Sequence, residues 1–75
     1  MRALPIMLNS PQEVKSFVNT MSHYSYDADL RSGRRVVDAK SILGIFSLDL
    51  RKPLTLVVYH DNCDSLIAEI QPLMV

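Results

Sequence analysis

The side chains that could carry chemistry in this chain are few and lie far apart in the sequence. There are two histidines, His23 and His60, and a single cysteine, Cys63. His60, Cys63 and nearby aspartates are groups that bind metal ions, but their spacing matches no established metal-binding motif. Cys63 has no second cysteine with which to form a redox motif. The sequence therefore predicts no metal site, surface positions for both histidines and a helix-capping position for the cysteine.

Ser41 is a candidate of a different kind, because it precedes a short apolar segment. The residues around it, Ala39-Lys-Ser-Ile-Leu-Gly-Ile-Phe-Ser-Leu48, predict a helix that runs from Ser41 to about Leu48. A serine at a helix start caps the helix, and the same position favours an anion if a kinase phosphorylates the hydroxyl. The two roles are compatible. A helix this short cannot bury all of its apolar residues, which are Ile42, Leu43, Ile45, Phe46 and Leu48.

A longer helix is predicted to begin at Ser10. Ser10 fits the N-cap, Pro11 the first helical position and Glu13 the third, which together make a capping box. One apolar stripe with helical spacing follows and fades near Ser22 to Tyr24; it consists of Val14, Phe17, Val18 and Met21. The same fit makes a structural role for the Ser10 hydroxyl the simpler interpretation.

The remaining segments predict four strands and a last helix. The strands are Arg2 to Leu8, Tyr26 to Arg31, Arg34 to Ala39 and Leu54 to Tyr59. Pro5 places the first strand at a sheet edge, and the fourth should be the most buried. A Ser32-Gly33 turn joins the second and third strands, which would pair Val37 with Ala28. The apolar face of the last helix is Leu66, Ile67, Ile70, Leu73 and Met74.

Length and composition limit the possible fold, binding partners and cellular compartment of this protein. With 75 residues the chain is predicted to form one domain, 1–75, in the element order βαββαβα, which is typical of a two-layer α+β sandwich. A net charge of zero argues against broad nucleic-acid binding, and no stretch is long enough to span a membrane. A single cysteine fits a reducing, cytoplasmic compartment. Three arginines, Arg31, Arg34 and Arg35, could bind a phosphate or an acidic partner, or form a solvated hairpin end balanced by Asp27, Asp29 and Asp38.

The segment from Ala39 to Leu48 resembles the regulatory-serine segment of HPr, the histidine-containing phosphocarrier of bacterial sugar phosphotransferase systems. The resemblance extends over nearly the whole chain, through Val14 to Tyr24, Tyr26 to Asp29 and Leu54 to Met74. It implies the HPr-like open-faced sandwich, in which three helices cover one face of a four-stranded antiparallel sheet.

The family carries phosphate on a histidine at the start of its first helix, within a Gly-Leu/Ile-His-x-Arg-Pro-Ala motif. An ungapped alignment puts Ser10 at the place of that histidine, Gln12 at the arginine and Glu13 at the proline. The resemblance therefore implies a divergent member without the active-site histidine. Helix dipole and arginine would stabilise a phosphohistidine, whereas Glu13 adds a negative charge.

The resemblance also implies roles for Ser41 and for the apolar residues that follow it. Ser41 matches the serine that an ATP-dependent kinase phosphorylates in many family members, and Ile42, Leu43 and Phe46 match an exposed apolar patch used for partner docking. Ile45 and Leu48 match core positions. From the residues alone, a core position remains the alternative for the patch.

The predicted function is therefore that of a regulatory or binding protein rather than an enzyme. It would present Ser41 and the patch to a protein partner, such as an HPr kinase or a transcriptional regulator, without a cofactor or metal ion. One alternative is a phosphocarrier that uses His23 or Ser10. Another is a structural subunit whose apolar patch is buried in a homo-oligomer.

Overall fold

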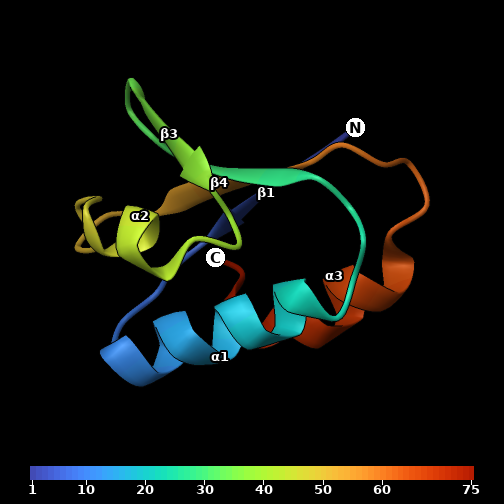
Figure 1. Cartoon of the computed structure of the whole chain (residues 1–75), viewed down its shortest axis with the longest axis horizontal. Helices are drawn as coiled ribbons and strands as arrows, with labels where there is room; N and C mark the ends of the chain where they lie inside the picture. The colour runs from blue at the N-terminus through green and yellow to red at the C-terminus, as the bar shows by residue number, and fades with distance from the viewer.

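The elements follow one another in the predicted order βαββαβα. The structure, a computed structural model, describes all 75 residues (Figure 1). The strands are β1 (Arg2–Ile6), β2 (Ala28–Ser32), β3 (Arg35–Asp38) and β4 (Leu54–Val58). The helices are α1 (Pro11–Ser22), α2 (Ile42–Phe46) and α3 (Asp64–Ile70), and a short 3₁₀ turn, η1 (Gln71–Leu73), follows α3. No helix combines the length and the apolar character that crossing a membrane requires.

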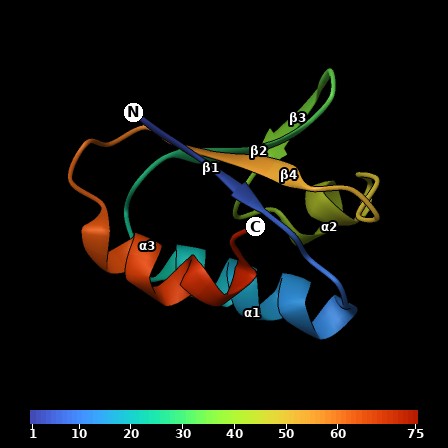
Figure 2. The same ribbon diagram turned by 180° about the vertical axis from the view of Figure 1, so that it is seen from behind.

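All four strands are antiparallel and lie in the order β1-β4-β2-β3. The strand β4 is therefore central, as its apolar sequence predicts, and β1 lies at an edge, as Pro5 predicts. One apolar row crosses the whole sheet, because the register aligns Leu4, Leu56, Leu30 and Val37. This row faces the helices, which lie on one side of the sheet in both views (Figures 1 and 2). The predicted open-faced sandwich, with helices on one face of a four-stranded antiparallel sheet, is confirmed.

The core lies between this face of the sheet and the helices. In α1 the predicted stripe is confirmed, since Val14, Phe17 and Met21 are buried and Val18 packs against the core at its margin. In α2 only Ile45 is buried. Leu48, which follows that helix, is also buried, so both residues belong to the core as the resemblance implies.

The hairpin register differs from the prediction. The two turn residues are Gly33 and Arg34, so Val37 pairs with Leu30 rather than with Ala28. Gly33 takes a positive φ of 59° at the first turn position, which suits the type of tight turn that has glycine there. Val37 still faces the core, because the shift moves its partner by two residues and leaves the alternation of faces unchanged.

The last helix is shorter than its apolar spacing predicts. The α-helix ends at Ile70, and Pro72 lies in η1 instead of the helix. The chain then runs along the outer edge of β1. The Met7 amide donates to the Leu73 carbonyl at 2.8 Å, Ile6 forms a β-bridge with Met74, and the Val75 amide donates to the Pro5 carbonyl at 3.2 Å. Leu73 and Met74 are half-buried through this edge contact rather than through a helical face.

Candidate functional site

The start of α1 and the end of α2 border the same surface hollow. This hollow has a volume of about 330 Å³ and is lined by Leu8, Asn9, Ser10, Pro11, Phe46, Leu50 and Arg51. The fold therefore brings Ser10, the residue at the place of the family histidine, to the same surface as Phe46 of the predicted patch. Leu50 and Arg51 were not predicted as site residues. They belong to the connection between α2 and β4, and no sequence motif marks them.

The Ser10 hydroxyl caps α1. Ser10 is in an extended conformation, and its Oγ accepts a hydrogen bond from the Glu13 amide at 3.1 Å. The Glu13 carboxylate in turn accepts from the Asn9 amide at 2.8 Å, one residue earlier than in the usual capping box. Two orphan amides are satisfied, and a half-buried carboxylate lies at the first turn of α1. The predicted capping function of Ser10 and Glu13 is confirmed.

Arg51 is the cation at the edge of this hollow, and Asp49 holds it. The Arg51 Nε lies 3.0 Å from the Asp49 Oδ1, and the Arg51 amide donates to the same oxygen at 3.1 Å. The hydrogen bond from the Arg51 guanidinium, helped by the one from the Arg51 amide, lowers the pKa of Asp49. The side-chain hydrogen bond to Asp49 and the charge of its carboxylate raise the pKa of Arg51. Because the guanidinium is paired, its charge is partly neutralised before any anion enters the hollow.

Ser41 caps α2 in the same way as Ser10 caps α1. Its Oγ accepts from the Gly44 amide at 3.1 Å, and its carbonyl accepts from the Ile45 amide at 2.9 Å. A tight turn positions it, because the Ser41 amide donates to the Asp38 carbonyl and the Asp38 carboxylate accepts from the Lys40 amide. Ser41 is half-buried. The predicted cap is confirmed; phosphorylation of Ser41 stays a prediction.

The three predicted patch residues differ in exposure. Leu43 is 82% exposed and Phe46 is 41% exposed. Ile42 is only partly exposed and packs against the core. The exposed apolar surface of α2 is therefore made by Leu43 and Phe46, with Ile42 at its margin.

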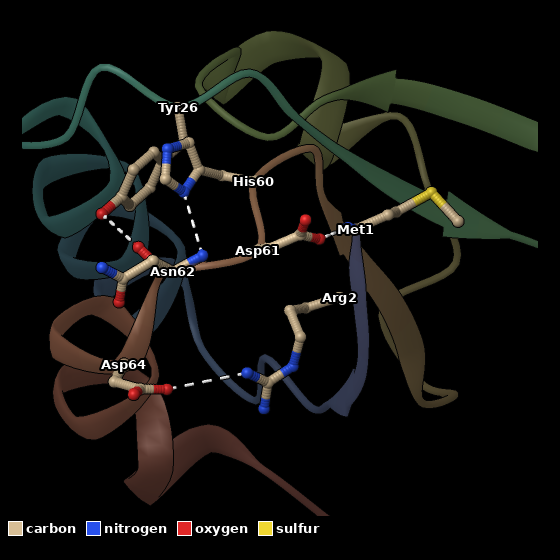
Figure 3. Close-up of polar contacts among 7 residues, drawn as sticks. All are labelled: Met1, Arg2, Tyr26, His60, Asp61, Asn62 and Asp64. Atoms are coloured by element: carbon tan, nitrogen blue, oxygen red, sulfur yellow. Dashed lines mark hydrogen bonds and ion pairs between the residues drawn. The ribbon is translucent and has the colours of Figure 1, made fainter.

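The two histidines lie away from the start of α1. His23 is the exposed C-cap of α1, at the opposite end from Ser10. His60 follows β4, where its Nδ1 accepts from the Asn62 amide at 3.1 Å and its ring lies 4.6 Å from that of Tyr26 (Figure 3). The Tyr26 hydroxyl donates to the Asn62 carbonyl, which ties the segment before β2 to the same loop. These contacts give His60 a structural function in the loop before α3.

Cys63 occupies the N-cap position of α3 but does not cap it through its side chain. It makes no side-chain cap hydrogen bond and is fully buried in the core. The predicted capping position is confirmed, and the thiol contributes to apolar packing. His60 is exposed, and no group of three or more histidine, cysteine or acidic side chains is arranged to hold a metal ion.

The three arginines of the hairpin do not form a common anion site. Arg31 donates to the Tyr59 hydroxyl at 3.3 Å, and that hydroxyl donates to Asp29 at 2.8 Å on the open face of the sheet. Arg35 donates to the Ser47 Oγ at 2.9 Å on the helical side. Arg34 lies in the exposed turn. The side chains diverge, which favours the solvated hairpin end over a phosphate site.

Comparison with known proteins identifies the family. A family model described as "PTS HPr component phosphorylation site" matches residues 13–74, a span that begins three residues after Ser10. No curated protein sequence matches the chain.

Solved structures agree with the family match. HPr-C-His from Thermoanaerobacter tengcongensis superposes with a TM-score of 0.82 at 25% identity, over 99% of this chain and 91% of that one. The phosphocarrier protein HPr from Bacillus anthracis gives 0.72 at 16% identity, over 99% and 96%. Crh, described as a catabolite repression protein of Bacillus subtilis with a swapped dimer, gives 0.67 at 20% identity, over 93% and 87%. With most of its length matched by the family model and its fold shared with these proteins, the chain belongs to the HPr family of the phosphotransferase system.

Proposed function

We propose that this chain is a regulatory or binding member of the HPr family that does not carry phosphate on a histidine and is not an enzyme. It acts in the cytoplasm, where a lone cysteine stays reduced. Its Ser41 and the exposed apolar surface of Leu43 and Phe46 are presented to a kinase or to another protein partner.

The observation that carries this proposal is the hydrogen-bonded cap at the start of α1. Ser10 stands where the resemblance expects the phosphohistidine, and its hydroxyl accepts from the Glu13 amide. The Glu13 carboxylate beside it would repel a phosphoryl group, and Arg51, which borders the hollow, is already paired with Asp49. Neither His23 nor His60 lies at this helix start.

The retained serine segment supports the regulatory half of the proposal. A phosphate on Ser41 would meet the amides of the first turn of α2, next to Lys40 in the chain. It would also place two negative charges beside Leu43, changing how the apolar surface binds a partner. Crh, a structural relative described as a catabolite repression protein, shows that this fold also occurs in a protein named for regulation rather than for phosphate transfer.

The kinase part is tested by incubating the chain with ATP and an HPr kinase and locating phosphate by mass spectrometry. We expect modification at Ser41, lost in Ser41→Ala and retained in Ser47→Ala, which changes the serine at the other end of α2. Absence of phosphate on Ser41 would remove the kinase from the proposal.

The partner part is tested with the exposed apolar side chains. Leu43→Asp and Phe46→Asp should abolish the capture of a partner, whereas Thr55→Asp, on the opposite face of the sheet, should not. Ile42→Asp is a poor probe, because Ile42 packs against the core. Equal binding by all three variants would contradict a docking surface on α2.

A phosphocarrier function through Ser10 is the second candidate, because Ser10 and the cation Arg51 border one hollow. It predicts phosphorylation by phosphoenolpyruvate and the first enzyme of the phosphotransferase system. Phosphate on Ser10 that is lost in Ser10→Ala, or acid-labile phosphate on His23, would establish a carrier and overturn the regulatory proposal. No transfer under conditions that label a known HPr would exclude this candidate.

A further inference from the structure

The two edges of the sheet are treated differently. The C-terminal part of the outer edge of β1 is closed, because Pro5 has no amide hydrogen and its carbonyl accepts from the Val75 amide. The Ile6–Met74 bridge and the hydrogen bond from the Met7 amide to the Leu73 carbonyl lie along the same C-terminal part of that edge. The opposite edge is β3, which pairs only with β2. The hairpin that carries this edge projects away from the helices in both views (Figures 1 and 2).

The backbone of Val36 points to this free edge. Ala39 donates to the Ala28 carbonyl at 3.0 Å, so residues 28 and 39 form a bonded pair of the antiparallel ladder. Bonded and non-bonded pairs alternate, which makes Leu30–Val37 bonded and Arg31–Val36 non-bonded. The amide and carbonyl of Val36 are therefore directed away from β2. The Asp38 carbonyl also faces outward, but it already accepts from the Ser41 amide.

The charges along the edge are arranged so that a second copy fits it. Val36 is 53% exposed on the open face, with Arg34 two residues before it and Asp38 two residues after it. If two β3 strands pair antiparallel about a two-fold axis at Val36, Arg34 lies opposite Asp38 of the partner subunit at both ends. A two-fold axis at Asp38 would place the two Asp38 carboxylates opposite each other. An axis at Val37 would place Val36 of one subunit opposite Asp38 of the other. Only the register centred on Val36 pairs opposite charges.

We propose that this chain self-associates through β3, with two Val36 residues at the two-fold axis. Two reciprocal hydrogen bonds join the Val36 backbones, and the two four-stranded sheets continue into one. The helix α2 does not block the edge, since it packs on the helical side of β3, where Arg35 contacts Ser47. A contact of one short strand buries little surface, so the dissociation constant should be on the order of 0.1–1 mM.

The first experiment measures self-association by sedimentation and by the concentration dependence of backbone NMR shifts, up to about 1 mM protein. Val36→Pro removes the outward amide and no internal ladder bond, and Val36→Thr keeps the amide. We expect a monomer–dimer equilibrium with shift changes centred on residues 34–38, preserved in Val36→Thr and weakened at least tenfold in Val36→Pro. Circular dichroism verifies that each variant folds.

The second experiment reverses the charges. Arg34→Asp and Asp38→Arg should each be monomeric alone, because each homodimer opposes like charges. Their mixture should form a heterodimer in which both pairs are restored. Arg34→Asp stands alone as a test if Asp38→Arg fails to fold, since Asp38 also accepts from the Lys40 amide.

Three results would overturn the proposal. They are a monomer at every concentration, a dimer indifferent to Val36→Pro, and a dimer lost in Leu43→Asp but kept in Val36→Pro. None of them depends on whether Ser41 is phosphorylated, so the proposed function and this inference fail separately.

Discussion

The Ser41 hydroxyl oxygen both caps α2 and limits what can stand at Gly44. It accepts the Gly44 amide hydrogen at 3.1 Å, and a methyl group placed on Gly44 would lie 3.0 Å from the same oxygen. That methyl group would also lie 3.2 Å from the Val37 Cβ of strand β3. The lack of a side chain at position 44 therefore allows the capped turn to pack closely against the sheet.

Gly44→Ala should destabilise the protein although alanine is the better helix former. The gain in helix propensity is about 1 kcal/mol, whereas overpacking a tight contact costs about 1–3 kcal/mol. The Val37 Cβ cannot move without its strand, so we expect a net loss in the free energy of unfolding, measured by urea denaturation. In a Ser41→Ala background the loss should be smaller, because the closest contact, that with the Ser41 Oγ, is relieved. A more stable Gly44→Ala protein would show that the turn has room to relax.

Ser10→Ala should lower the free energy of unfolding by about 1 kcal/mol, because the Glu13 amide loses its acceptor. For a domain of this size that corresponds to a fall of about 4–8 °C in the melting temperature. Ser10→Asp keeps an acceptor and should lose less. Ser16→Ala, in the exposed middle of α1, is the matched control and should change stability by less than about 0.5 kcal/mol. Equal effects of Ser10→Ala and Ser16→Ala would mean that the cap contributes nothing.

The Asp49–Arg51 pair should make stability depend on pH in the acidic range. The folded-state pKa of Asp49 lies below its ordinary value of 3.8, so the ionised carboxylate stabilises the fold above that value. This contribution is lost as the pH falls from there through the lowered folded pKa. Asp49→Asn should therefore be less stable than the wild type at neutral pH, and the difference should shrink as the pH falls below 3.8.

Carboxyl titration by NMR checks the cause of this shift. In Arg51→Met the pKa of Asp49 should rise back towards 3.8, because the hydrogen bonds and charge of the guanidinium are gone. An unchanged Asp49 pKa in that variant would contradict the assignment to Arg51.

Cys63 should react with thiol reagents only when the protein unfolds, because it is fully buried. The labelling rate in native buffer should be far below that in urea and should rise in any destabilised variant. Cys63→Ala should lower the free energy of unfolding, since it removes a fully buried side-chain atom from the core. Rapid labelling of the native protein would show that the N-terminal end of α3 opens locally.

Local signals in the sequence predicted most of the fold. The element order, the position of β1 at an edge, the burial of β4, the stripe of α1 and both serine caps follow from spacing and short-range chemistry, and all are confirmed. These features depend on residues within a few positions of one another. Pro5 disfavours an inner strand and the Ser10–Glu13 box favours a helix start, whatever the rest of the fold is.

Long-range geometry could not be predicted in the same way. The hairpin turn uses Gly33 and Arg34 rather than Ser32 and Gly33, so the register of β2 and β3 differs from the prediction. Helix α3 ends before Pro72, and Met74 therefore pairs with Ile6 at the edge of β1. Arg51 entered the candidate site only because the α2–β4 connection folds back towards the start of α1. The sequence likewise could not predict which residues of α2 are exposed, since that depends on which side of a five-residue helix packs against the core.

The sequence by itself determined the caps, the strands and the family, because each arises from near neighbours in the chain or from a pattern along it. Only the tertiary structure decided that the free edge belongs to β3 and that Ser10, Phe46 and Arg51 share one hollow. Such relationships depend on the packing of segments distant in sequence. Their contacts are set by the whole core rather than by any local propensity.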